Sequence, residues 1–254
     1  MTRPAIIWAE ARTGGTFLAT CLSNHPRIAF CRGEPFHRGN PWCVAIPDER
    51  ERLQAITSQC HFDVAGCKLF RDHAHRPEIW DWICQVSPLT IYLWREDYVA
   101  QALSIVANRV YRTTGEGIPT HPYRRLEAVS VELEPEEVKF EIERLELRYG
   151  IRGDDTKSNQ AILRSADLRV LPLTYEQITG GMAEATMLDA KTAERIWAFL
   201  GVDPTPLPRV KLRRAHHRPW ASYVSNWDVV REAIASMVNL EDFPATRDGG
   251  EQES

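Results

Sequence analysis

The sequence predicts an α/β protein in three layers, with a central, mostly parallel sheet flanked by helices. Two apolar runs, at 6–9 and 89–94, are typical of strands that are buried on both faces. Each run precedes a segment with helical spacing of its apolar residues, and this alternation favours the α/β class. The 254 residues, 43% of them hydrophobic, suffice for one sizeable domain, which we expect over residues 1–243.

The first of these strands leads directly into a glycine-containing turn, Arg12-Thr13-Gly14-Gly15-Thr16, and then into a helix from about Thr16. Glycines allow backbone conformations that aim successive N–H groups at one point, and the helix dipole adds positive potential there. Arg12, Thr13 and Thr16 complete a cradle for a phosphate or sulfuryl group. An ordinary turn between a strand and a helix remains the alternative for this segment alone. The Gly-Lys-Ser/Thr ending of nucleoside triphosphatases is absent, which argues against that class.

Further along the chain the same patterns predict the remaining elements. We expect an exposed loop over 112–130 and a disordered tail over 244–254. The strands are expected at 28–31, 61–70 and 168–173, and the helices at 49–57, 98–110, 134–149, 191–200 and 226–240.

Several polar residues stand where chemistry is plausible on a sheet of this kind. Glu34 and His37 lie on a loop rich in glycine and proline, where a carboxylate serves either as a general base or as a solvated loop acid. Lys68 interrupts an apolar strand and points either to the surface or into a site. Arg95 follows the strand at 89–94, at the edge where parallel sheets bind ligands, and Ser104 lies in the next helix.

Charge and cysteine usage narrow the possible partners and compartments. The formal net charge of −4 argues against bulk binding of nucleic acid or anionic membranes. We see neither a membrane-spanning run nor a signal peptide, and expect a cytoplasmic protein. The six cysteines have no Cys-x-x-Cys spacing, so we expect reduced thiols and no metal site. Basic residues concentrate near Lys211 and Arg213, either as a phosphate clamp or as a solvated linker.

Taken together, residues 4–240 resemble the sulfotransferases that use 3′-phosphoadenosine 5′-phosphosulfate (PAPS), particularly their bacterial and carbohydrate-directed branches. The turn and Phe17 fit the phosphosulfate loop of that family, except that Gly15 stands where the family has a hydroxyl residue. The order and approximate spacing of the matching segments carry the resemblance more than any one of them. The other matching segments are Asn24-His25-Pro26, Glu34-Pro35-Phe36, Arg95 with Ser104, Tyr175-Glu176 and Phe199-Leu200-Gly201-Val202.

The resemblance implies a P-loop-type fold and sulfuryl transfer from PAPS to a hydroxyl of a small molecule or glycan, without a metal. Glu34 would be the base, with His37 in reserve and His73 as a weaker candidate, and Arg12 would stabilise the developing charge. The site of the 5′-phosphosulfate would span Arg12, Thr13, Gly14, Gly15, Thr16 and Phe17, that of the 3′-phosphate would use Arg95 and Ser104 with Lys211 or Arg213, and Tyr175 would lie near the adenine.

Two other functions compete with this interpretation. A small-molecule kinase with a degenerate phosphate loop would need a metal-binding acid, which the sequence does not offer convincingly. A non-catalytic nucleotide-binding protein would leave Glu34 as a surface acid. The sequence is compatible with a homo-oligomer and does not specify the acceptor.

Overall fold

The protein is described here by a computed structural model, which covers residues 2–31, 33–36, 40, 44–113, 130–151, 157–181, 185–206, 210 and 220–242. The chain forms two compact units. One comprises residues 1–94 and 159–210, and the other comprises residues 95–158 and 211–254. Neither unit is contiguous in sequence. The single domain expected over 1–243 remains a prediction.

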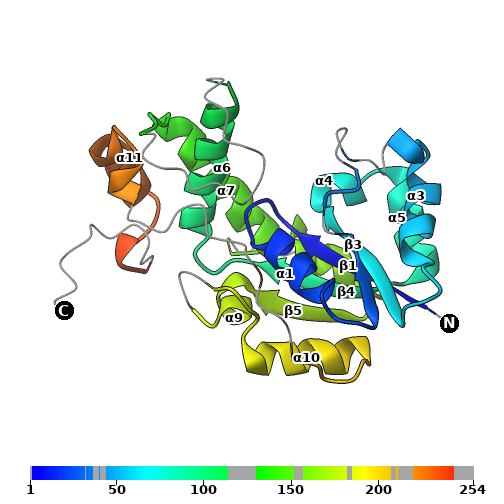
Figure 1. Ribbon diagram of the computed structural model, residues 1–254. Helices are drawn as coiled ribbons and strands as arrows, with labels where there is room; N and C mark the ends of the chain where they lie inside the picture. The colour runs from blue at the N-terminus through cyan, green and yellow to red at the C-terminus, as the bar shows by residue number, and fades with distance from the viewer. Residues whose placement is uncertain are drawn as a thin grey trace. The chain divides into compact units, whose positions relative to one another are not determined.

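The first unit contains a five-stranded, all-parallel sheet in the order β2-β3-β1-β4-β5 (Figure 1). Parallel neighbours require crossover connections, and helices supply them here, so the predicted α/β class with a central parallel sheet is confirmed. β1 is the central strand, paired with β3 on one side and β4 on the other. The strands are β1 (Arg3–Ala9), β2 (Ile28–Phe30), β3 (Val64–Phe70), β4 (Leu89–Trp94) and β5 (Val170–Thr174).

The described residues of this unit include the helices α1 (Gly15–Leu22), α3 (Glu49–Thr57), α4 (Arg71–Ala74), α5 (Pro77–Val86), α8 (Asn159–Ser165), α9 (Tyr175–Thr179) and α10 (Ala190–Leu200). Helices α3, α5 and α8 bury apolar residues with Trp8 and Leu69 in one core. Successive strand residues face opposite sides, so Ala9 and Lys68 face the other way, and both lie against the start of α1. The sheet is therefore the middle of three layers.

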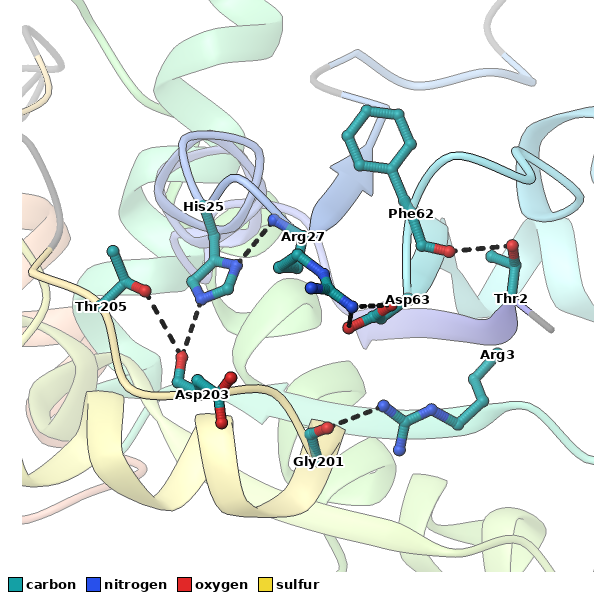
Figure 2. Close-up of polar contacts among 9 residues, drawn as sticks. All are labelled: Thr2, Arg3, His25, Arg27, Phe62, Asp63, Gly201, Asp203 and Thr205. Atoms are coloured by element: carbon teal, nitrogen blue, oxygen red, sulfur yellow. Dashed lines mark hydrogen bonds and ion pairs between the residues drawn. The ribbon is translucent and has the colours of Figure 1, made fainter.

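Hydrogen bonds and an ion pair connect the chain segments at the amino ends of β1, β2 and β3 (Figure 2). His25 accepts a hydrogen bond at Nδ1 from the Arg27 amide (3.1 Å), and its Nε2 lies 3.0 Å from the carbonyl oxygen of Asp203. Because the backbone N–H of Arg27 can only donate, Nδ1 must be unprotonated. Nε2 therefore carries the ring proton and donates it to the carbonyl oxygen of Asp203. Arg3 donates to the carbonyl of Gly201 at 2.9 Å. The segment after α10 is thus attached to the sheet.

The described part of the second unit contains α6 (Tyr98–Thr113), α7 (Pro135–Tyr149), α11 (Trp227–Ala235) and the short 3₁₀ turns η2 (Trp220–Ser222) and η3 (Leu240–Asp242). Tyr149 on α7 donates to Gln101 on α6 at 2.8 Å, and Arg109 pairs with the buried carboxylate of Glu141 at 2.8 Å. Among the helices that the structure describes, none combines the length and apolar character needed to cross a membrane.

Most elements match the sequence-based expectations within a few residues. The helix expected over 226–240 is shorter than predicted. Helix α11 ends at Ala235, and Ser236 is its C-cap. The segment containing His73 is the one-turn helix α4, for which no element was predicted. Helix α5 had not been predicted, although Ile79, Trp82 and Ile83 show helical spacing on its buried face. The tail over 244–254, and residues 114–129 of the expected loop, lie outside the described residues.

Candidate anion-binding site

The turn that follows β1 has two residues in the left-handed backbone region. Gly14 has φ +81°, and Arg12 has φ +66°, a conformation that non-glycine residues rarely adopt. Gly14 is the N-cap of α1 and, having no side chain, makes no side-chain cap. The first N–H groups of α1 therefore have no capping oxygen from that residue, and the helix dipole favours an anion there.

The ring of Tyr175 lies directly against Gly14. A Cβ at position 14 would stand 2.6 Å from Cδ2 of Tyr175, which is closer than two carbon atoms approach without displacement. Tyr175 is the first residue of α9, whose start is fixed by a reciprocal capping box between Thr174 and Gln177. Gly14 is thus required both by its backbone conformation and by the aromatic ring beside it.

Thr13 contributes to the turn differently from the expectation that its hydroxyl faces a ligand. The residue is fully buried, and its Oγ1 donates to the carbonyl of Glu10 at 2.9 Å. Glu10 is also buried, and its Oε1 accepts from Nδ2 of Asn159 at 3.1 Å. The hydroxyl of Thr13 therefore helps to shape the turn from within. Phe17 is likewise buried, with 9% of its surface exposed.

Lys68, whose direction the sequence left open, points into the turn. It lies on β3 opposite Ile7 of β1, and its side chain is only 5% exposed. Its Nζ donates to Thr16 Oγ1 at 3.1 Å and to Glu34 Oε1 at 3.0 Å. A buried cation, a hydroxyl and a carboxylate therefore meet at the start of α1. The turn lacks the lysine of a Walker loop, and the lysine at the start of α1 comes from β3 instead.

The electrostatic surroundings of Lys68 favour an added anion. Burial is the largest influence and lowers the pKa of Lys68 below its usual range, because it penalises the charged ammonium. The carboxylate of Glu34 opposes this shift, whereas the positive charge of Arg12 lowers the pKa of Lys68 further. Two cations act on one turn, and a bound phosphate or sulfate would stabilise both of them.

The carboxylate of Glu34 is more accessible than its partner, since 34% of its side chain is exposed. His73 lies in the same neighbourhood, with its ring centroid 5.6 Å from that of Phe36 and 5.4 Å from that of Phe70. Burial, followed by the charge of Arg76, lowers the pKa of His73. Its Nδ1 is buried and has no hydrogen-bond partner among the described residues. Both Glu34 and His73 are half-buried, and Glu34 contacts the Lys68 ammonium at the turn.

The structure brings together the predicted residues of the turn, Glu34 and Tyr175, all within the first unit. Arg12 is exposed on this turn. Arg95 and Ser104 belong to the second unit, where both are buried. Three other predicted residues, His37, Lys211 and Arg213, lie outside the described residues.

The sequence did not predict that Lys68 and Glu10 would make buried contacts. The signal for Lys68 was present, because a single charge within an apolar strand rarely remains without a partner. Glu10 gave a weaker signal, since an acid just after a strand is ordinary. Where the structure describes the chain, it shows no group of three or more His, Cys, Asp or Glu side chains placed to bind a metal ion.

Comparison with families of known proteins found no family that matches this chain, and comparison with curated proteins found no matching sequence.

Proposed function

We propose that the protein is a sulfotransferase that moves a sulfuryl group from PAPS to an acceptor hydroxyl of a small molecule or glycan. One observation carries the proposal: the buried ammonium of Lys68 joins Thr16, at the uncapped start of α1, to the accessible carboxylate of Glu34. An anion site and a candidate base thus adjoin. In a protein that only binds a nucleotide, the same carboxylate would serve as the charge partner of buried Lys68, so sulfate transfer separates the two functions.

In this proposal Arg12, Thr16 and the first amides of α1 would hold the 5′-phosphosulfate. Such fixed donors stabilise charge that develops on the leaving oxygen without a metal. Glu34 would accept the acceptor's hydroxyl proton while the acceptor oxygen bonds to sulfur, the bond from sulfur to the bridging oxygen breaks, and adenosine 3′,5′-bisphosphate leaves. PAPS supplies the transferred group as the donor substrate.

The remaining roles rest on the resemblance of the sequence to this family. Arg95 and Ser104 would bind the 3′-phosphate, with Lys211 or Arg213, and Tyr175 would lie near the adenine. His37 is the reserve base. We place the reaction in the cytoplasm, in keeping with the free thiols of the described cysteines.

Ligand-dependent thermal stability tests the donor class. Adenosine 3′,5′-bisphosphate at a hundred times its dissociation constant should stabilise the protein by about 2.7 kcal/mol. ADP, and ATP with magnesium, serve as matched controls that lack the 3′-phosphate. Stabilisation by ATP with magnesium and none by the bisphosphate would instead support a phosphotransferase.

Transfer of labelled sulfate to a panel of hydroxyl acceptors then tests for catalysis. Glu34→Gln should lower turnover about 10²–10⁴-fold, because it removes the general base but keeps the size of the side chain. Asp63→Asn is the matched control, since Asp63 also pairs with a cation but lies before β3, at the other end of that strand. Full turnover in Glu34→Gln would exclude this residue as the base, and bisphosphate binding without transfer would favour a binding protein.

A further inference from the structure

The ammonium of Lys68 makes three contacts. Besides Thr16 and Glu34, it lies over the ring of Phe70, 4.7 Å from the centroid. A lysine ammonium has three N–H donors, and the face of an aromatic ring attracts a cation. The three contacts come from α1, from the segment after β2 and from β3 itself. Together they hold the ammonium in one place.

Gly15 leaves the space through which the Lys68 side chain reaches this point. A Cβ at position 15 would stand 2.7 Å from Lys68 Cδ and 3.5 Å from Cγ. The backbone does not require glycine here, because Gly15 is the first helical residue of α1 and is not among the residues with positive φ. A side chain at position 15 would therefore displace Lys68 from this path, which gives a physical reason for glycine where the resembling family has a hydroxyl residue.

We propose that Lys68 is a positioning residue that holds the carboxylate of Glu34 beside Thr16, and that Gly15 is the residue that admits it. The role rests on the proposed function, in which Glu34 accepts the acceptor's proton. Glu34 lies on a segment between β2 and α3, and a third of its side chain is exposed. Phe36, two residues further on, anchors this segment in the core, and Lys68, buried on β3, holds the side chain of Glu34 itself.

The contact itself can be tested without any turnover. The titration of Lys68, followed by its side-chain ¹⁵N resonance, should move to lower pH in Glu34→Gln, because the carboxylate raises the pKa of Lys68. Gly15→Ser should also change this titration by displacing the side chain. Gly15→Ala is a smaller second variant should the serine variant not fold. Gly181→Ser is the control for adding a side chain, since a Cβ there meets nothing within 4 Å; its φ of +73° adds backbone strain, so urea unfolding is measured for both variants.

A double-mutant cycle on turnover tests the positioning role. Lys68→Met should lower kcat about 10²-fold, the effect of misplacing a catalytic group by about 1 Å. In a Glu34→Gln background the same change should have little further effect on kcat, because no base remains to be positioned, and the loss of the Lys68 charge from the anion site should raise the KM for PAPS instead. Gly15→Ser should lower kcat in the native background and much less in Lys68→Met.

The outcomes separate the two proposals. An unchanged Lys68 titration in both Glu34→Gln and Gly15→Ser would overturn the positioning contact. Additive losses of kcat for Lys68→Met and Glu34→Gln would also overturn the positioning role, while sulfuryl transfer itself stood. A coupled Lys68 titration in a protein that binds no bisphosphate would uphold the contact and refute the proposed function.

Discussion

The two ends of the parallel sheet use polar residues in opposite ways. At the amino ends of β1–β3, His25 has both ring nitrogens in hydrogen bonds to backbone groups, and Arg27 pairs with Asp63 at 2.7 Å at the surface. At the carboxyl end of β1, Lys68 is buried and joins a hydroxyl to an accessible carboxylate. The polar residues at the first end attach protein segments to one another, whereas those at the second surround a turn suited to an anion.

The difference follows from how parallel strands are connected. The segments entering the strands must be held in register, and buried backbone groups there need partners. At the carboxyl end of β1, the chain continues through a turn into the first residues of a helix. The N–H groups at the start of this helix create a positive potential there. Burial of Lys68 costs stability unless a negative charge offsets it. The carboxylate of Glu34, 3.0 Å from the Lys68 ammonium, supplies that charge.

Among the substitutions that test this difference between the two ends, Gly14→Ala should have the largest effect on stability and ligand binding. Gly14→Ala combines an unfavourable left-handed conformation with a contact to the Tyr175 ring and should cost about 2–3 kcal/mol of unfolding free energy. It should also abolish stabilisation by adenosine 3′,5′-bisphosphate. Gly181→Ala is the matched control, because Gly181 has a similar φ of +73° with open space around it. Urea unfolding and thermal shift measure both effects, and full ligand stabilisation in Gly14→Ala would contradict the assignment of the turn.

Substitution of His25 should affect the opposite end alone. His25→Phe leaves the Arg27 amide and the Asp203 carbonyl without their ring partner, and should lower the free energy of unfolding by about 1–2 kcal/mol. The affinity for adenosine 3′,5′-bisphosphate, measured by titration calorimetry, should stay unchanged. Arg27→Gln is the control, because it keeps the amide and removes only an exposed ion pair. A large loss of affinity in His25→Phe would break the proposed division between the two ends.

The pH dependence of stability should show a smaller effect of His73. Because the folded-state pKa of His73 is lowered, the unfolded chain binds the proton first as pH falls below about 6.5. The resulting loss of stability is at most about 1.4 kcal/mol per pH unit and is absent at higher pH. His73→Phe should weaken the dependence, as measured by urea unfolding between pH 7 and 5. An identical slope in this variant would show that other groups cause it.

Local sequence patterns determined most of the elements of the fold. Helix α3 starts and ends where its pattern predicts, and Asp48 caps it by accepting from the Glu51 amide at 2.8 Å. The strand at 89–94 and the turn around Gly14 were also readable, because burial on both faces and left-handed turns each leave a local signature. Short helices such as α4 and α9 leave little signature, since they are too short for a periodic pattern.

Only the tertiary structure decided which side chains meet at the turn. The register that places Lys68 opposite Ile7 depends on strands separated by some sixty residues, and it directs the ammonium to the face on which α1 begins. The sequence could identify Gly15 as a departure from a pattern but not explain it, because the reason is a side chain on another strand. Periodicity and turn chemistry act over a few residues, whereas a site forms where distant segments converge. The arrangement of Lys68, Thr16 and Glu34 is therefore a property of the folded chain.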